Sequence, residues 1–206
     1  MVGYVEALVA SRAAVDLSVA QRVKDASVAA LLVAKSSQAA ERRVELRIEP
    51  GSAVELLDAK SSFDLATVVG NLIQNGVAAV VSASGDAPHA GADELPIGWV
   101  AVELRQTGDV VQVRVKDSGP GPAGSIASEV FQHGFTTKAA KGGARGIGLA
   151  LIRQICRTRG GDVEVRTSDS GAEFAAWLTV SPAKTGDEPF LPAKLNGQGR
   201  ETEPVS

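Results

Sequence analysis

The sequence predicts an α+β fold, a two-layer sandwich in which helices cover one face of a mixed, mostly antiparallel sheet. Segments in which apolar residues alternate with polar ones come in adjacent pairs, which favours hairpins over a doubly wound parallel sheet. Segments with helical period separate these pairs. The 206 residues are 44% hydrophobic, enough for the core of one domain of ordinary size with appended segments.

The composition excludes several classes of protein. The net charge of −3 is too close to neutral to indicate a nucleic acid or an anionic membrane surface as partner. We see no apolar run of the roughly 20 residues that a membrane span needs, and no signal peptide at the N-terminus. The single cysteine, Cys156, excludes an internal disulfide and fits a reducing compartment. We therefore expect a cytosolic chain, or the cytosolic part of a larger protein.

The first quarter of the chain is expected to be helical. Residues 1–42 contain no proline and are rich in Ala, Val and Leu. A break is expected near Lys24, where Asp25 or Ser27 would cap a second helix. Residues 44–48 then alternate as Val-Glu-Leu-Arg-Ile, which predicts a half-buried strand.

Residues 63–83 return to helical period. Asn71 and Asn75 are four residues apart, so they lie on the same face of this predicted helix. The Gly, Pro and Asp content of residues 84–98 indicates a loop. The apolar stripe of the helix consists of Leu65, Val69, Leu72, Ile73, Gly76 and Val80.

A hairpin is predicted next. Residues 100–105 and 111–115 both alternate, with a Thr-Gly-Asp turn between them, and the second strand ends at Asp117. Residues 125–131 are expected to form a short helix, and residues 132–145 a basic, glycine-bearing, mobile loop.

The last third repeats the helix-then-hairpin pattern. Residues 146–159 form a predicted helix, ended by Gly160 and Gly161. Residues 162–167 and 172–180 form the final hairpin. The tail, residues 183–206, has little apolar content and is expected to be disordered. The apolar stripe of the helix is expected to be Leu149, Ile152 and either Ile155 or Cys156.

Asp117, Gly119 and Gly121 suit recognition of a base. A carboxylate at a strand end can accept a hydrogen bond from the exocyclic amine of adenine, whereas guanine presents an oxygen at that position. Glycines let the backbone pass close to a flat ring. A plain turn with a solvated aspartate explains this stretch about equally well when it is taken alone.

Two further features suit a nucleotide. The amide oxygens of Asn71 and Asn75 are suitable ligands for Mg²⁺, although a solvated polar helix face is the simpler explanation of this pair alone. Gly146 and Gly148 start a helix, and helix N-termini bind phosphate oxygens. The basic residues before that start, Lys138, Lys141 and Arg145, are placed to close over a triphosphate.

In their joint order these motifs resemble the catalytic ATP-binding domain of sensor histidine kinases. This domain has a Bergerat-type fold and belongs to the superfamily of gyrase, heat-shock chaperone, histidine kinase and MutL. The resemblance covers about residues 43–180. The sequence of residues 130–155 is similar to that of the citrate and C4-dicarboxylate sensor subfamily. The matching motifs are NLIQN, DSGPGP, VFQHGFTTK, GIGLAL and a weaker SGAEF.

The resemblance implies ATP and Mg²⁺ as cofactors and gives roles to individual residues. It implies that Asn75 ligates Mg²⁺, that Asp117 recognises adenine, and that Asn71, Asn75 and Lys138 serve catalysis. The residues that it implies for ATP binding are Asn75, Asp117, Gly119, Gly121, Phe135, Thr136, Thr137, Lys138, Arg145, Gly146, Ile147, Gly148 and Leu149.

The resemblance also implies a domain division and partners. Residues 43–182 would be the ATP-binding domain, and residues 1–42 the remnant of a dimerisation hairpin whose histidine-bearing helix is missing. The implied partners are the histidine-bearing dimerisation domain of the parent kinase, a response regulator, and a second copy in a full-length homodimer. The parent would be a membrane-anchored sensor with this part in the cytosol. His89 and His133 lack the following acidic residue that the phosphoacceptor histidine has in this family.

Position 71 bears on the reaction. Hydrolysing members of the superfamily carry a glutamate four residues before the metal asparagine, and a neutral amide such as Asn71 cannot act as a general base. We therefore expect ATP to be bound, hydrolysed poorly, and kept for transfer to histidine. The alternatives are a serine kinase of the same superfamily that regulates anti-sigma partners, and a degenerate scaffold without transfer activity.

The sequence departs from the family pattern at three positions. Gly76 replaces the usual alanine, at a cost of roughly 1 kcal/mol in a helix interior. Ala78 stands where a charged residue is frequent, and Ala172 where the last motif usually has its second glycine. These departures bear on the catalytic rate rather than on the binding of the nucleotide.

Overall fold

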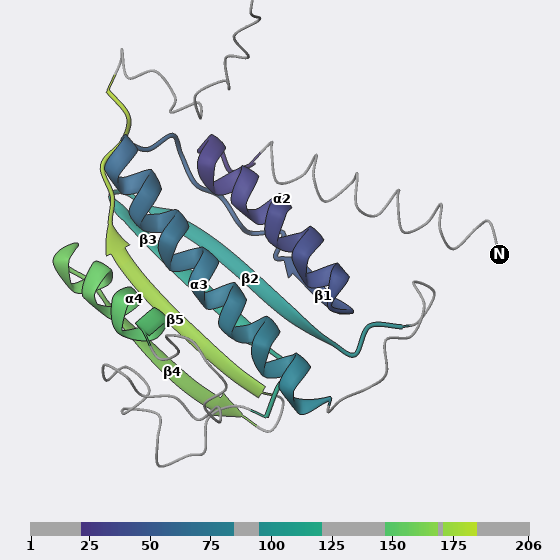
Figure 1. Cartoon of the computed structure of the whole chain (residues 1–206). Helices are drawn as coiled ribbons and strands as arrows, with labels where there is room; N and C mark the ends of the chain where they lie inside the picture. Colours follow the sequence, from purple (N-terminus) through teal and green to yellow (C-terminus); the bar gives the residue numbers. More distant parts are fainter. Residues whose placement is uncertain (1–21, 85–94, 121–146, 169–170, 185–206) are drawn as a thin grey trace, which may run out of the picture.

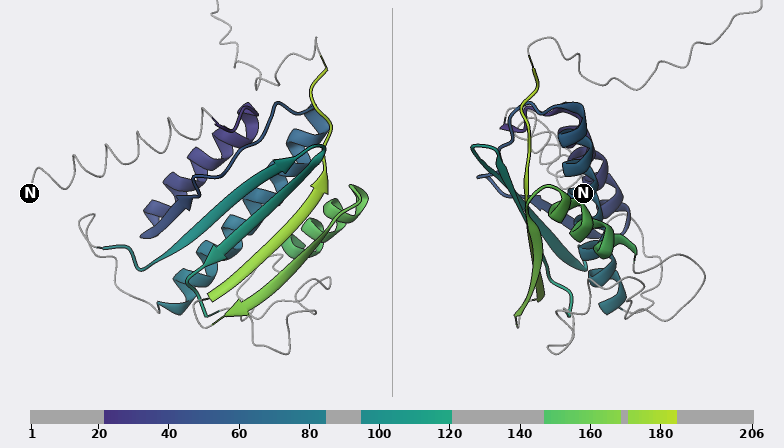
Figure 2. Two further views of the ribbon diagram at one scale, coloured as in Figure 1. Left: turned by 180° about the vertical axis from the view of Figure 1, so that it is seen from behind. Right: turned by 90° about the vertical axis from the view of Figure 1, so that its left-hand side faces the viewer.

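The computed structural model describes residues 22–84, 95–120, 147–168 and 171–184. A five-stranded sheet carries helices on one face and leaves the other open (Figures 1 and 2). This confirms the predicted two-layer α+β sandwich. The elements are α2 (Ala26–Glu41), β1 (Val44–Ile48), α3 (Ala59–Ala83), β2 (Gly98–Thr107), β3 (Val110–Asp117), α4 (Ile147–Thr158), β4 (Asp162–Ser168) and β5 (Gly171–Thr179).

The sheet has the strand order β1-β2-β3-β5-β4. The strands β1 and β2 pair in parallel because α3 connects them, and the other three pairs are antiparallel. Both predicted hairpins are therefore confirmed. The pairing of β3 with β5 brings Asp117 opposite Ala172, so the end of the first hairpin meets the start of the last strand.

Period-two alternation builds the core. Val100, Val102 and Leu104 of β2 are fully buried under the helices. The predicted apolar positions of β3 and β5 are buried in the same way, and so is the whole predicted stripe of α3. In α4, Ile152 and Cys156 form the buried stripe. The sequence alternation thus sets which face of each element points inward.

The helix α2 belongs to the same core as the sheet. It packs on α3 and β1, and it buries Val28, Leu32 and Ala39. Its N-cap is Asp25, whose carboxylate accepts hydrogen bonds from the Val28 backbone at 3.0 Å and from Ser62 Oγ at 2.8 Å. In the described residues α2 therefore shares one core with the sheet, and the predicted domain division at residue 42 stays a prediction. Residues 1–21, 121–146 and 185–206 lie outside the described part, so the predictions made there stay predictions.

The central helix α3 is 25 residues long and apolar enough to cross a membrane by length and composition alone. No such segment was predicted from the sequence. In the structure α3 lies across the sheet (Figure 1), and Leu65, Leu72 and Ile73 are fully buried there. Core helices of globular proteins pass the same test of length and composition.

A polar cluster joins α4 to α3 near the C-terminal end of α4. The Arg159 guanidinium lies 2.8 Å from the Asp64 carboxylate, and it donates a hydrogen bond to Ser61 Oγ at 2.9 Å. Both charged side chains are mostly buried, at 13% and 17% exposed. Ser61 Oγ also accepts from the backbone of Ser181, so the cluster reaches the end of the last strand.

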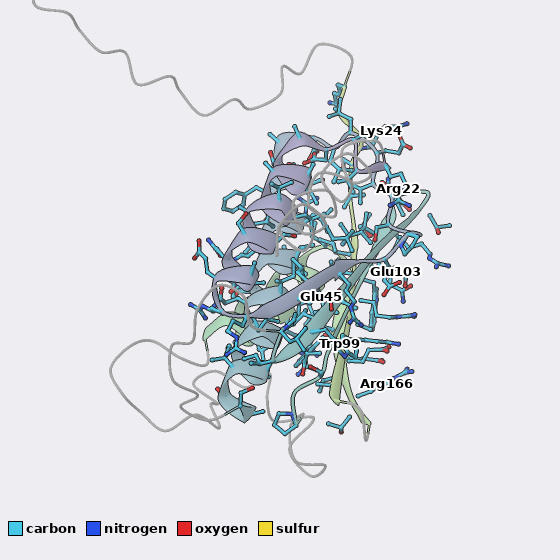
Figure 3. The ribbon with its side chains drawn as sticks, turned by 90° about the vertical axis from the view of Figure 1, so that its right-hand side faces the viewer. Arg22, Lys24, Glu45, Trp99, Glu103 and Arg166 are labelled. Carbon is cyan, nitrogen blue, oxygen red and sulfur yellow. The ribbon has the colours of Figure 1, made fainter. Side chains whose placement is uncertain are left out.

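The open face of the sheet is covered by charged side chains rather than by a second layer. Glu45, Trp99, Glu103 and Arg166 all lie on this side (Figure 3). Glu103 pairs with Arg114 at 3.5 Å, and Lys116 pairs with Glu173 at 3.0 Å, so charges of both signs are matched across the strands. Arg47 lies over the Trp99 ring, 5.2 Å from its centroid.

Candidate functional site

Asp117 ends β3 in a buried position, where its side chain is aimed back at the following turn. It is 2% exposed, and its Oδ1 accepts a hydrogen bond from the Gly119 backbone at 2.9 Å. Burial raises the pKa of the Asp117 carboxyl above its ordinary value, while the backbone N–H groups of Gly119 and Ala172 favour the ionised form. The side chain is therefore held and desolvated, unlike the solvated aspartate of a plain turn.

The turn is fixed on both sides by two residues, Gly171 and Ser118, for which the sequence predicted no role. Gly171 has φ 128°, and a β-carbon there would lie 1.7 Å from the carbonyl oxygen of Asp117. Ser118 is hydrogen bonded twice to Trp99: its Oγ accepts from the Trp99 N–H at 2.9 Å, and its N–H donates to the Trp99 carbonyl at 3.0 Å. Gly171 lies in the weak SGAEF motif and Ser118 in the DSGPGP motif, but neither motif indicated these contacts.

The helix α3 lies directly against this turn. A β-carbon at Gly76 would be 3.3 Å from the Asp117 β-carbon, and one at Gly119 would be 3.0 Å from the Ala79 β-carbon. Gly76 and Ala79 are three residues apart, so they lie on one face of α3. The absence of side chains at Gly76 and Gly119 is what permits this approach.

The start of α4 approaches α3 from another direction. A β-carbon at Gly148 would lie 3.2 Å from Asn71 Oδ1. The Asn71 amide is held in this orientation because its Nδ2 donates to the Thr67 carbonyl at 2.8 Å. The structure thus places two predicted segments against α3, the helix that carries the asparagines. One is the turn after Asp117, and the other is the start of α4 at Gly148.

Asn75 lies one helical turn beyond Asn71 and is half-buried. Its Nδ2 is buried without a hydrogen-bond partner among the described residues. A buried polar group of this kind needs an explanation, and a ligand or ordered water is the usual one. Leu149, which the resemblance implied for ATP binding, is partly buried against the core, and Ile147 is the first residue of α4.

The other predicted contacts lie outside the described residues, so their placement stays a prediction. They are Gly121, Phe135, Thr136, Thr137, Lys138, Arg145 and Gly146. The described part of the chain holds no group of three or more His, Cys, Asp or Glu side chains that would bind a metal by themselves.

A separate hollow of about 310 Å³ lies between α2 and α3 and contains none of the predicted site residues. Lys35 is among its lining residues, and its ammonium donates to Gln38 Oε1 at 3.1 Å and to Gln74 Oε1 at 3.2 Å. Burial, with the charge of Arg42, lowers the pKa of Lys35. The carbonyl oxygens of the two glutamines thus satisfy this lysine, and the convergence around α3 remains the better candidate site.

Comparison with known proteins identifies the family of the chain. The family described as histidine kinase-, DNA gyrase B- and HSP90-like ATPases matches residues 61–182. The sensor protein CitS of Halalkalibacterium halodurans is 31% identical over 168 residues, which are 81% of this chain and 29% of CitS. The probable C4-dicarboxylate sensor kinase of the same organism is 32% identical over 170 residues, or 82% of this chain and 29% of that kinase.

Solved structures show the same fold. Full-length ShkA, solved in complex with AMPPNP, matches with a TM-score of 0.59 and 23% identity, over 77% of this chain and 30% of ShkA.

The fold and the site define an ATP-binding module of the α+β sandwich type. The chain belongs to the family of histidine kinase-, DNA gyrase B- and HSP90-like ATPases, and within it to the ATPase domains of sensor histidine kinases, as the resemblance implied. It spans less than a third of the length of the two sensor kinases compared above.

Proposed function

We propose that this chain binds Mg·ATP and transfers the γ-phosphoryl group to a histidine on a dimerisation helix outside this sequence. The observation that carries the proposal is that Gly148 approaches Asn71 on α3 and that Asp117 approaches Gly76, about one turn further along the same helix. A buried carboxylate, a helix start and an amide-bearing helix face are the three parts needed to hold a base, phosphates and a metal. The similarity to sensor kinases, rather than to serine kinases, favours histidine as acceptor.

Adenine recognition would rest on Asp117. A carboxylate that is 2% exposed can accept from the 6-amino group of adenine without competition from water. The same group leaves guanine with an acceptor facing an acceptor, and an unpaired buried group is costly. Gly119 and Gly171 would serve by holding the carboxylate and its backbone in place.

The phosphates would lie toward the start of α4, where backbone N–H groups at Ile147 and Gly148 begin the helix. Asn71 faces this start with its amide oxygen. An amide does not remove a proton from water, so these residues would orient the phosphoryl group and leave it for another acceptor. Lys138, from the predicted basic loop, would neutralise charge on the triphosphate.

The residues present fit Mg²⁺. Asn75 offers an amide oxygen, and its buried Nδ2 has no partner in the described part of the chain, as expected beside a site completed by water and ligand. Mg²⁺ takes few protein ligands and keeps waters and phosphate oxygens. When bound, it would neutralise phosphate charge. Asn75 would hold it, and Asn71 would support the neighbouring helix start.

The proposed partners follow from the class of protein. The chain would act on the histidine-bearing dimerisation domain of its parent kinase, in a homodimer, and the phosphoryl group would pass to a response regulator. The domain would work on the cytosolic side of a membrane-anchored sensor. Similarity to the citrate and C4-dicarboxylate sensors supports this placement.

Two measurements test the proposal. A fluorescent ATP analogue is titrated into the chain with and without Mg²⁺, and a histidine-bearing helical hairpin is then supplied with labelled ATP. We expect binding, and phosphate on the hairpin that is lost in acid. Acid-stable phosphate would indicate a serine kinase, and binding without transfer would indicate a scaffold.

Asn75→Ala is the informative variant, and Gln74→Ala is its matched control, because Gln74 faces Lys35 on α2 instead. We expect Asn75→Ala to remove the effect of Mg²⁺ on binding and Gln74→Ala to keep it. If both variants behave as the unmodified chain does, Asn75 is not the metal residue.

A further inference from the structure

Gly76 is one of two glycines, with Gly70, in the interior of the 25-residue helix α3. Helix interiors disfavour glycine because it loses the most conformational freedom on folding. The residue therefore needs a reason in the packing around it. Gly70, on the same helix, provides a comparison because it is also buried.

The surroundings of these two glycines differ. A β-carbon at Gly76 would lie 3.2 and 3.3 Å from the γ-carbons of Val100 and 3.3 Å from the β-carbon of Asp117. A β-carbon at Gly70 would lie no closer than 3.5 Å to anything, and its neighbours are the flexible ends of Leu31 and Lys35. An alanine fits at Gly70 and is crowded at Gly76.

The crowding at Gly76 involves groups that cannot easily move. Val100 and Asp117 are directly paired in the β2–β3 ladder, and they are 0% and 2% exposed. Each is therefore fixed by backbone hydrogen bonds on the sheet side. A methyl group between them and the helix would shift either α3 or the Asp117 side chain, since packed interiors have no spare room.

Such a shift would reach the turn after Asp117. Ala79, on the same face of α3 as Gly76, would lie 3.0 Å from a β-carbon at Gly119. The carboxylate is also bonded to the Gly119 N–H at 2.9 Å. The spacing between α3 and β3 therefore sets both the position of the carboxylate and the position of the glycine that holds it.

We propose that Gly76 is the positioning residue of the adenine pocket, because its missing side chain sets how closely α3 approaches Asp117 and so where the carboxylate meets a 6-aminopurine. The proposal rests on the proposed function, which gives Asp117 the contact to adenine.

The test compares Gly76→Ala with the matched control Gly70→Ala in the full 206-residue chain. Affinity is measured by titration calorimetry for ATP and for inosine triphosphate, which carries an oxygen in place of the 6-amino group. We expect Gly76→Ala to lower the ratio of the affinity for ATP to the affinity for inosine triphosphate by about three- to tenfold. This is the range that one misplaced hydrogen bond produces. Affinity for inosine triphosphate and the preference of Gly70→Ala should stay as in the unmodified chain.

A purely structural role for Gly76 would weaken both nucleotides equally or lower stability alone, and either result would overturn the proposal. So would an unchanged preference in Gly76→Ala. If the unmodified chain binds ATP without preferring it, the inference fails. If it binds neither nucleotide, the proposed function itself fails.

A double variant covers the case in which Gly76→Ala does not fold. Val100→Ala removes two of the three carbons within 3.3 Å of the added methyl group and leaves only the Asp117 β-carbon, so Gly76→Ala/Val100→Ala relieves most of the crowding. We expect this variant to fold and to recover most of the ATP preference. A folded double variant that has lost the preference would contradict positioning through this contact.

Discussion

Asp117→Asn separates recognition of adenine from stability of the fold. The substitution keeps the size of the side chain and an oxygen for the Gly119 N–H, which donates to Oδ1 at 2.9 Å. It removes the negative charge that would accept from the adenine amine. Hydrogen bonds to charged groups contribute about 1.5–3 kcal/mol, and full burial of Asp117 keeps water from replacing the contact. We therefore expect ATP binding to weaken by roughly ten- to a hundredfold.

Stability should change in the opposite sense. Because burial raises the folded-state pKa of Asp117, its contribution to stability is full below the ordinary aspartate pKa and is lost as pH rises through the raised value. Asparagine has no such dependence. At neutral pH the Asn variant should unfold at the same temperature as the unmodified chain or a higher one, and this difference should vanish toward about pH 4.

Intrinsic fluorescence offers a direct assay. The Trp99 backbone is hydrogen bonded to Ser118 in the turn after Asp117, so the emission of this tryptophan should report a shift of that turn on nucleotide binding. Trp177→Phe removes the other tryptophan and leaves Trp99 as a single reporter. ATP and GTP are titrated into both forms of residue 117. An Asn variant that keeps the original preference for ATP over GTP would refute the assignment of Asp117 to adenine.

Three further outcomes are expected. Gly171→Ala should destabilise the chain by several kcal/mol in thermal unfolding, since its β-carbon would overlap the Asp117 carbonyl at 1.7 Å and its φ is 128°. Burial opposes ionisation of Asp162, but hydrogen bonds from Val163 and Arg157 lower its pKa. The contribution of ionised Asp162 to the free energy of unfolding should therefore be present above about pH 4 and lost as pH falls further. In Asp162→Asn the free energy of unfolding should depend less on pH in this acid range. Burial raises the pKa of the Cys156 thiol to about 12, so thiol reagents at pH 8 should modify it only after unfolding.

Local patterns predicted most of the fold because they encode which side chains face inward. The alternation through Val100, Val102 and Leu104 gave both the strand and its buried face. The capping aspartate of α2, Asp25, was also among the predicted residues. The sandwich itself followed from the order of elements, since adjacent strand pairs leave few ways to build one sheet.

What sequence reasoning missed are contacts between distant segments. Gly76 was interpreted as a costly departure, because its closeness to Asp117 depends on how α3 crosses the sheet. Gly171 gave a weak signal for the same reason: its conformation is required by a carbonyl 54 residues earlier in the chain (171 − 117). The convergence of Asn71 with Gly148 was predicted only through the family resemblance, since spacing within one helix does not reveal what packs on it.

The sharing of one interior by α2 and α3 has a practical consequence for anyone preparing shorter forms of this protein. A fragment begun at residue 61, where the family match begins, would discard β1 and α2 and expose the apolar side of α3 that they cover. The Lys24 N–H also donates a hydrogen bond to the Val54 carbonyl, so even a fragment that starts at α2 would lose this hydrogen bond. The smallest unit able to fold alone should therefore include Arg22 and run at least to Ala183, whose N–H bonds back to Leu56.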